Sequence, residues 1–111
     1  MQQDFTADNW EDDDGMPAGG YVEAQGLRID WQNGPLRTHG DEEPDPPNGA
    51  FVETVLAAAR QRLAYYQTAA SGRFYCIENE LAIDYIDRAL LQLNERTAQR
   101  TERGVEGTHQ P

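Results

Sequence analysis

Three arginines near the end of the chain have the spacing and the chemistry of an anion-binding site. Arg96, Arg100 and Arg103 recur at helical spacing and continue one apolar face of the same predicted helix. None of the three has an acidic residue three or four positions away within that helix. Their partners must therefore lie outside it. The candidates are carboxylates elsewhere in the protein or an anionic ligand such as a phosphate, which guanidinium groups hold bidentately.

A cluster of aromatic residues and an amide lies near the start of that helix. The cluster comprises Tyr65, Tyr66, Phe74, Tyr75 and Asn79. Aromatic faces stack nucleobases for about 1–3 kcal/mol each, so this cluster and the arginines together suit a small nucleotide. The alternative is that the rings only seal a core. At about 1.5 Å per residue the two clusters lie roughly 40 Å apart, so they form two separate sites or meet across an antiparallel partner subunit.

The remaining reactive residues form no catalytic set. His39 lies in an acidic loop and His109 near the end of the sequence, so neither is placed beside a nucleophile. Cys76 is the single cysteine, which excludes an intrachain disulfide and fits a buried structural role. Because neither paired histidines nor a cysteine cluster occurs, we expect no metal site, no cofactor and no enzymatic activity.

Charge is distributed unevenly along the 111 residues. Residues 1–50 hold 12 of the 20 acidic residues but only two of the nine arginines, and the net charge is −11. So acidic a surface argues against binding long DNA or RNA, whereas a small anion in an arginine pocket is still allowed. The sequence has neither a stretch of 18 apolar residues nor a signal-peptide pattern, so we expect a soluble, intracellular protein that does not enter a membrane.

The pattern along the chain predicts an α+β fold with a single domain over residues 21–111. Residues 1–20 are acidic and poor in apolar residues, which predicts a disordered tail. Residues 21–36 alternate apolar and polar side chains around a turn at Gln25-Gly26. We therefore expect residues 21–47 to form a small antiparallel β-hairpin and a loop.

Residues 48–111 are predicted to form a long antiparallel αα-hairpin and a C-terminal segment. Asn48 is a suitable N-cap for a helix from about Gly49 to Ala70, and a second helix runs from about Tyr75 to Arg103. The short connection makes the two helices antiparallel. The main apolar seam of the second helix consists of Ala82, Tyr85, Ile86, Ala89 and Leu93. Several other apolar residues of this helix fall outside the seam, so we expect a homo-oligomer. The apolar residues outside the seam are Ile77, Leu81, Ile83, Leu90 and Leu91.

Several segments resemble the phage cyclic-nucleotide sponges, the related Thoeris anti-defence and anti-CBASS proteins. The resemblance covers residues 21–111, and the Arg-Gly-Val-Glu-Gly-Thr-His segment at 103–109 is its most specific part. Asn48–Glu53 and Phe74–Cys76 also match. Trp31–Leu36, together with the expected hairpin, favours the Thoeris-inhibiting branch, because the anti-CBASS branch is largely helical.

The resemblance implies a non-enzymatic hexamer in the cytoplasm of the infected bacterium, which sequesters immune second messengers without cleaving them. For the Thoeris branch the ligand is a cyclic ADP-ribose isomer bound where subunits meet, and several relatives also bind cyclic di- or trinucleotides at separate pockets. Carried over by position, Phe74 stacks a base, Asn79 gives polar recognition, and Arg100 and Arg103 contact phosphate or ribose. Further expected ligand-binding residues are Arg28 and, around a trinucleotide on a threefold axis, Arg96, Thr97 and Thr108.

Two other functions stay open at this stage. A small cyclic-nucleotide hydrolase would need a general base, for which Glu78, Glu106 or His109 could serve. An adaptor would grip a host protein with the apolar flank of the helical hairpin and would need no arginine site.

Overall fold

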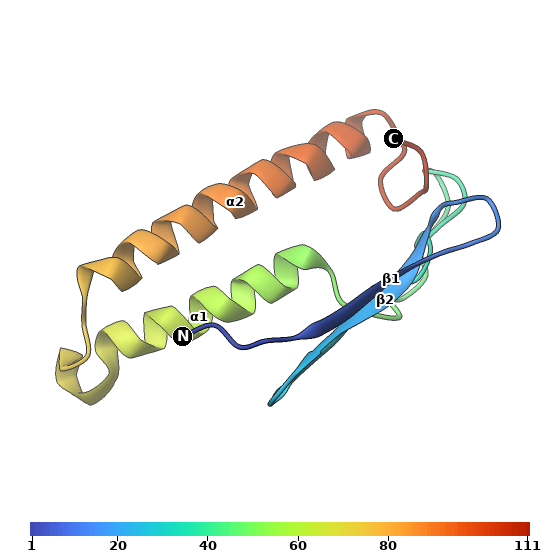
Figure 1. Ribbon diagram of the computed structural model, residues 1–111. Coiled ribbons are helices and arrows are strands. Elements are labelled where there is room, and N and C mark those ends of the chain that lie inside the picture. The colour runs from blue at the N-terminus through green and yellow to red at the C-terminus, as the bar shows by residue number, and fades with distance from the viewer. The chain divides into compact units, whose positions relative to one another are not determined.

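The computed structural model describes residues 1–111, which form two compact units. One unit comprises Met1–Phe51 with Arg100–Pro111 and contains a three-stranded sheet, and the other comprises Val52–Gln99 and contains two helices. The elements follow one another as β1, β2, β3, α1 and α2 (Figure 1). The fold is therefore α+β, which confirms the class predicted from the sequence. Neither helix is apolar over a stretch long enough to cross a membrane.

The sheet of the first unit is antiparallel, with the strand order β1-β2-β3. β1 (Thr6–Glu11) pairs with β2 (Pro17–Ala24), and β2 pairs with β3 (Leu27–Asp30). The turn between β2 and β3 falls on Gln25-Gly26, so the predicted hairpin is confirmed. The predicted sheet lacked one strand, because β1 lies within the segment that was expected to be a tail.

Residues 1–20, expected to be disordered, contribute β1 and the first half of β2. Every residue of β1 is exposed, so no pattern of buried apolar residues marks this strand in the sequence. The pairing depends instead on a close backbone approach at Gly20. Gly20 has a φ of +146°, and a Cβ there would lie 2.3 Å from the carbonyl oxygen of Asp8. Glycine therefore allows the ladder of backbone hydrogen bonds that orders β1.

Asn48 was predicted to cap the first helix, but its side chain is used in the loop that follows β3. The backbone N–H of Asn33 donates to Asn48 Oδ1 at 2.8 Å, and Asn48 Nδ2 donates to the carbonyl oxygen of Asn33 at 3.0 Å. Because this amide binds the loop, it does not initiate a helix. The first helix accordingly begins at Val52, three residues later than the predicted Gly49.

The second unit is an antiparallel pair of helices, α1 (Val52–Gly72) and α2 (Ile77–Glu102), as predicted (Figure 1). Arg60 on α1 forms an ion pair with Asp87 on α2 at 2.5 Å. Gln67, seven residues further along α1, donates to Glu80, seven residues earlier on α2. These two contacts define an antiparallel register. Half-buried side chains recur every three or four residues on both helices, so each has one partly covered face.

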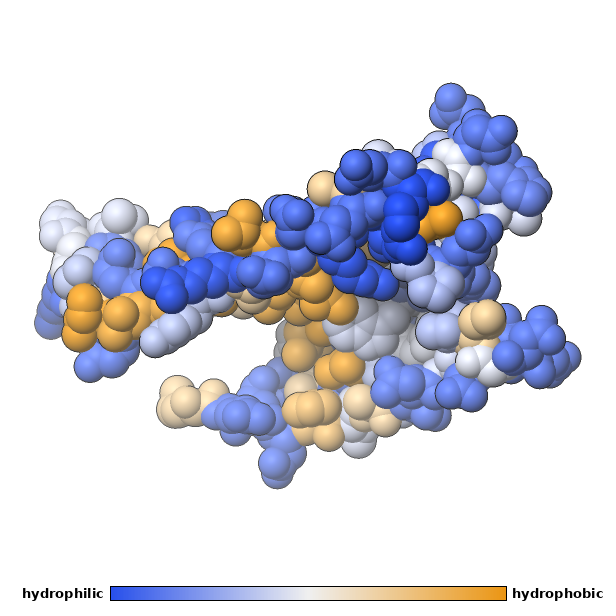
Figure 2. All heavy atoms as spheres, turned by 90° about the horizontal axis from the view of Figure 1, so that it is seen from above, coloured by the Kyte–Doolittle hydropathy of each residue, from blue (hydrophilic) through white to orange (hydrophobic).

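The partly covered face of α2 includes most of the predicted seam but extends beyond it: the half-buried seam residues are Ala82, Ile86, Ala89 and Leu93. Ile83 and Leu90, expected outside the seam, are half-buried, whereas Tyr85, expected within it, is 66% exposed. No hydrophobic side chain of the chain is buried, and large apolar side chains reach the surface (Figure 2). A single chain therefore leaves much apolar area in contact with water.

α1 ends in a strained turn that connects it to α2. Ala69 has an extended conformation, with φ −60° and ψ 147°, so the regular helix stops at Thr68. Ala70 and Ser71 follow with φ values of 51° and 57°, and Gly72 has a φ of 84°. A left-handed conformation costs a non-glycine residue about 1–2 kcal/mol, so contacts from elsewhere must hold this turn in place.

Substitution of Gly20 tests the close approach between β1 and β2. Gly20→Ala should lower the free energy of unfolding by about 1–3 kcal/mol beyond its backbone cost, because the added Cβ collides with the Asp8 carbonyl. Gly15→Ala is the matched control, since Gly15 has a φ of +78° and an added Cβ there meets no atom within 4 Å. Urea unfolding measures both losses, and amide exchange reports whether β1 detaches. Equal losses for the two variants would contradict this account.

The ion pair between the helices predicts a dependence on pH. Hydrogen bonding to Arg60 lowers the pKa of Asp87 below its ordinary value of 3.8. A carboxyl group with a lowered pKa stabilises the folded state above its ordinary pKa, and that stabilisation is lost as the pH falls through the lowered value. Arg60→Gln should return the Asp87 pKa to its ordinary range in an NMR titration. An Asp87 pKa that stays low in the variant would show that another group lowers it.

Candidate functional site

The C-terminal segment that carries the expected Arg-Gly-Val-Glu-Gly-Thr-His motif is an ordered loop. Gly104 has a φ of 74°, and its N–H donates to the carbonyl oxygen of Thr101 at 3.0 Å. The N–H of Val105 donates to the carbonyl oxygen of Arg100, also at 3.0 Å. These two bonds form the Schellman motif that ends many helices. They reverse the chain, so that the residues after Gly104 fold back along the last turn of α2.

Arg100 holds this loop through its guanidinium group. Nη2 donates to the carbonyl oxygens of Val105 at 2.9 Å and Thr108 at 2.8 Å. Nη1 donates to the carbonyl oxygens of Pro111 at 3.2 Å and Gln110. An arginine fork has four terminal N–H groups and one on Nε, so only Nε–H is left for another acceptor. Arg100 was expected to contact phosphate or ribose, but within the chain its terminal nitrogens bind backbone carbonyls.

Arg37 is a second arginine that fixes the loop, and it is not among the binding residues expected from the sequence. Its Nε donates to the carbonyl oxygen of Glu106 at 2.7 Å, and its Nη2 pairs with Glu106 Oε2 at 3.0 Å. The carbonyl oxygen of Gly107 accepts the backbone N–H groups of Leu36 and Arg37 at 2.7 and 3.1 Å. The Arg37 side chain is only 14% exposed and that of Glu106 is 36% exposed, so the ion pair is shielded from water mainly on its arginine side. Glu106 lies three residues after the last of the helical arginines Arg96, Arg100 and Arg103, which we call the arginine stripe. An acid at this place was the available signal of a cation partner elsewhere in the chain.

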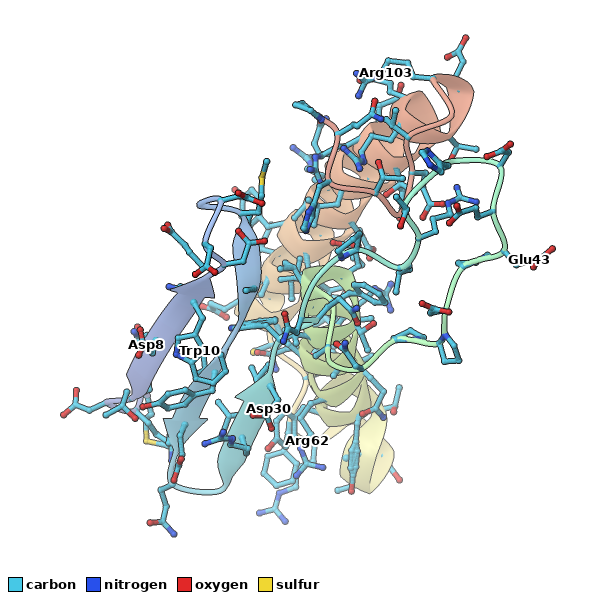
Figure 3. The ribbon with its side chains drawn as sticks, turned by 90° about the vertical axis from the view of Figure 1, so that its right-hand side faces the viewer. Asp8, Trp10, Asp30, Glu43, Arg62 and Arg103 are labelled. Atoms are coloured by element: carbon cyan, nitrogen blue, oxygen red, sulfur yellow. The ribbon has the colours of Figure 1, made fainter.

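Thr108 and Arg103 contribute to the same loop to different degrees. Thr108 Oγ1 donates to the carbonyl oxygen of Val105 at 2.6 Å and accepts the N–H of Gln110 at 3.2 Å. Its hydroxyl group is therefore used inside the loop. Arg103 is exposed at the end of α2, where Nη2 donates to the carbonyl oxygen of Pro111 (Figure 3). Most of its donors face solvent.

Arg96 and Thr97 lie one to two turns before the loop. Arg96 is exposed and takes part in none of the ion pairs of the chain. Thr97 is also exposed, and its Oγ1 donates to the carbonyl oxygen of Leu93 at 3.2 Å. Within the arginine stripe, Arg96 and Arg103 are thus the side chains whose charged donors are most open to a ligand.

The predicted aromatic site is an exposed surface of the second unit. Phe74 is 58% exposed and Tyr75 is 55% exposed in the turn between the helices. The guanidinium carbon of Arg73 lies 5.8 Å from the centre of the Phe74 ring. Asn79, in the first turn of α2, is half-buried. The Phe74 ring is therefore accessible to a flat ligand, with a cation beside it.

A second group of a cation and aromatic rings lies on α1, and its arginine is not among the binding residues expected from the sequence. The guanidinium carbon of Arg62 lies 4.8 Å from the centre of the Tyr66 ring and 5.0 Å from that of Tyr65. Arg62 Nε also donates to the Tyr66 hydroxyl oxygen at 3.3 Å. The spacing of three and four residues on one helix was the available signal. Arg62 projects from α1 beside the rings (Figure 3).

Arg28, on β3, is paired with carboxylates of its own sheet. It contacts Glu23 Oε2 and Asp30 Oδ1, each at 2.7 Å, and its guanidinium carbon lies 4.7 Å from the centre of the Tyr21 ring. These hydrogen bonds raise the pKa of Arg28 and lower the pKa of Asp30. The ring centre of Trp10, on β1, lies 6.1 Å from the ring centre of Tyr21 (Figure 3). Two rings, one cation and two acids therefore share a face of the sheet. An anionic ligand at Arg28 would have to displace these carboxylates.

The structure brings Arg100, Arg103 and Thr108 together in the C-terminal loop. Phe74 precedes the first residue of α2, whereas Arg100 and Arg103 stand at or just beyond its last turn. A helix of 26 residues is about 39 Å long, so α2 separates the aromatic end from the arginine end. No three residues of the types His, Cys, Asp and Glu are arranged to hold a metal ion. The chain therefore offers groups that bind anions and groups that stack on rings, on separate surfaces.

Alanine substitutions at two arginines of the stripe distinguish an arginine that holds the C-terminal loop from one whose donors face solvent. Arg100→Ala should lower the free energy of unfolding by about 2–3 kcal/mol, because four carbonyl oxygens lose a charged donor. Arg96→Ala, on the same helix face, should change it by less than about 0.5 kcal/mol. Thermal melting measures both, and amide exchange at Val105 and Thr108 reports the loop. A loss at Arg96 as large as that at Arg100 would show that the carbonyl contacts are not the cause.

No family model matches the sequence. The chain is 42% identical over 82 residues to a protein of Bacillus phage SBSphiJ7 named Thoeris anti-defense 1. The matched residues make up 74% of this chain and 51% of the relative, so the chain spans about half the length of the relative that it matches. This identity agrees with the resemblance seen in the arginine-glycine motif, the Phe74 segment and the small sheet. The comparison therefore shows that most of this chain is similar to a Thoeris anti-defence protein.

Proposed function

We propose that this chain counters Thoeris immunity during phage infection and acts in the cytoplasm of the infected bacterium. The observation that carries the proposal is the 42% identity over 82 residues to Thoeris anti-defense 1 of a Bacillus phage. The matched length includes most of this chain, so the proposal concerns the region that both proteins share.

The mechanism that we propose is sequestration of a cyclic nucleotide signal without cleavage. The exposed Phe74 ring supplies a stacking surface for a base, and Arg96 and Arg103 supply charged donors for phosphate. The favoured ligand is a cyclic ADP-ribose isomer, with cyclic di- and trinucleotides as further ligands. Glu106, one of the possible general bases of a hydrolase, is paired with Arg37. That pairing supports binding in preference to hydrolysis.

The proposed binding form is a homo-oligomer, a hexamer by the family resemblance. Ile77, Leu81 and Tyr85 recur at every fourth residue of α2 and are 56%, 49% and 66% exposed. An exposed apolar stripe of this kind is normally covered by another subunit. An antiparallel partner would place the Phe74 of one subunit near the arginine end of another. Sharing the ligand between subunits would also raise its affinity.

The expected ligand-binding residues take different roles in this proposal. Phe74 and Asn79 would recognise a base, and the solvent-facing donors of the arginine stripe would bind phosphate or ribose. Arg100 and Thr108 would act by shaping the C-terminal loop, and Arg28 would act from the sheet after releasing a carboxylate. The residues assigned to phosphate or ribose are Arg96, Thr97 and Arg103.

Calorimetry with recovery of the ligand tests the proposal. We expect one of a panel of cyclic ADP-ribose isomers, cyclic dinucleotides and cyclic trinucleotides to bind tightly, and to be recovered intact after the protein is denatured. A Kd near 1 nM corresponds to about 12 kcal/mol. A cleaved product would instead identify a hydrolase, and the absence of any binding would favour an adaptor. Light scattering should give a multiple of 12.5 kDa, and a mass of 12.5 kDa would contradict a shared site.

Substitution of Phe74 tests the stacking role. Phe74→Ala should weaken nucleotide binding by about 1–3 kcal/mol, because the base loses its stacking partner. Phe74→Tyr keeps an aromatic ring and should bind within about threefold of the unchanged protein. The same calorimetric titration measures both variants, and light scattering checks that each keeps its oligomeric mass. Equal weakening by the two substitutions would show that the ring itself is not the binding group.

A further inference from the structure

Gln67 is the one side chain that the chain buries. It is 8% exposed, although it is polar and lies on an amphipathic helix. Buried amides need hydrogen-bond partners, because an unpaired polar group away from water is costly. In α1 Gln67 stands one residue before Thr68, at which the regular helix stops. Its position therefore suggests a role in the turn between the helices.

The partners of Gln67 all lie beyond that turn. Nε2 donates to the carbonyl oxygen of Cys76 at 2.9 Å and to Glu80 Oε1 at 2.9 Å. Oε1 accepts the backbone N–H of Cys76 at 3.2 Å. Both amide hydrogens and the amide oxygen are thus used. The amide hydrogen-bonds to both backbone polar groups of Cys76, as a neighbouring strand would. It therefore joins the end of α1 before the turn to the residue that follows the turn.

The turn that Gln67 closes is the strained one. Ala70, Ser71 and Gly72 have consecutive positive φ values, and only the last is a glycine. Inside the turn, the N–H of Arg73 donates to the carbonyl oxygen of Ala70 at 3.2 Å. The N–H of Tyr75 donates to the carbonyl oxygen of Gly72 at 3.1 Å. These two bonds are local and do not connect the turn to either helix. The backbone N–H of Glu80 donates to the Cys76 carbonyl oxygen at 3.4 Å, which ties the end of the turn to α2, and the Gln67 amide ties it to α1.

We propose that Gln67 is a positioning residue that sets the affinity of the aromatic site by fixing the turn that presents Phe74. Cys76, which Gln67 holds by both backbone polar groups, lies two residues after Phe74 and three residues before Asn79. Fixing Cys76 therefore fixes the stacking ring relative to the half-buried amide. The inference rests on the proposed function, because it assigns Gln67 to the same nucleotide site.

The chemistry of the amide gives a specific test. Gln67→Glu keeps the shape of the side chain but at pH 7.5 replaces the donor by an oxygen. That oxygen would face the Cys76 carbonyl and the Glu80 carboxylate. Arg60, which lines a groove between the helices together with Gln67 and Glu80, is already paired with Asp87 and therefore offsets the repulsion only in part. At about pH 5 the new carboxyl group, whose pKa the carbonyl and the carboxylate raise, would regain a proton and could donate again.

The measurement combines nucleotide binding with amide exchange. The probe is the isomer or cyclic nucleotide that binds the unchanged protein most tightly. At pH 7.5 we expect Gln67→Glu to bind it about tenfold more weakly and to exchange the Cys76 amide faster by a similar factor. Both effects follow if fewer molecules have the turn closed. The apparent affinity scales with the fraction of molecules in which the turn is closed, and the Cys76 amide exchanges when the turn is open. At pH 5 its affinity should return to within about threefold of that of the unchanged protein at the same pH.

The control is Gln61→Glu, which makes the same change of charge at an exposed residue of the same helix. It should bind within about twofold of the unchanged protein at both pH values. Normal binding and normal exchange in Gln67→Glu would overturn the inference. So would weaker binding that lowering the pH does not restore, or faster exchange along all of α1, because either result indicates a general loss of stability.

Failure of the proposed function has a different signature. If the unchanged protein binds none of the nucleotides, the assignment of Gln67 to a nucleotide site is overturned together with that function. Amide exchange at Cys76 then still decides whether Gln67 closes the turn.

Discussion

Hydrogen bonds from side chains to backbone groups hold each unit of this chain in shape, since neither unit buries a hydrophobic side chain. Arg100 gathers four carbonyl oxygens of the C-terminal loop, and Arg37 binds the same loop at Glu106. Gln67 closes the turn between the helices by pairing with Cys76. Such bonds are directional, so they specify one conformation where apolar contacts alone would allow several. The segments that carry the expected binding residues are those that these polar contacts fix.

The regular elements could be predicted from the sequence because their signals are local. The hairpin of β2 and β3 follows from period-two alternation around Gln25-Gly26, and the two helices follow from helical periodicity on either side of Gly72. β1 could not be predicted, because its side chains are all exposed and its pairing depends on Gly20, which lies beyond the end of the strand in the sequence. The start of α1 was placed too early because Asn48 bonds to a loop residue instead of the helix.

The candidate site was predictable only as far as residue type. Helical spacing placed Arg96, Arg100 and Arg103 on one face, but it could not show that the chain turns back and surrounds Arg100 with its own carbonyl oxygens. Arg37 lies in a loop of acids and prolines, where no periodic pattern points to its partner 69 residues away. Gln67 is a polar residue on a helix, and in sequence it differs in no way from the exposed Gln61. Long-range partners of this kind become visible only in three dimensions.

The exposed outer strand of the sheet also limits how copies of this protein can meet. β1 is at one end of the strand order, so its outer backbone N–H and C=O groups are unpaired within the sheet. Such an edge invites an identical edge to add to it, and chains can then polymerise into continuous sheets. Here Asp8 and Glu11 lie in the strand itself and Asp12–Asp14 follow it directly. Two such edges repel each other, so the acidic residues oppose the growth of continuous sheets and leave other surfaces of the chain for contacts between copies.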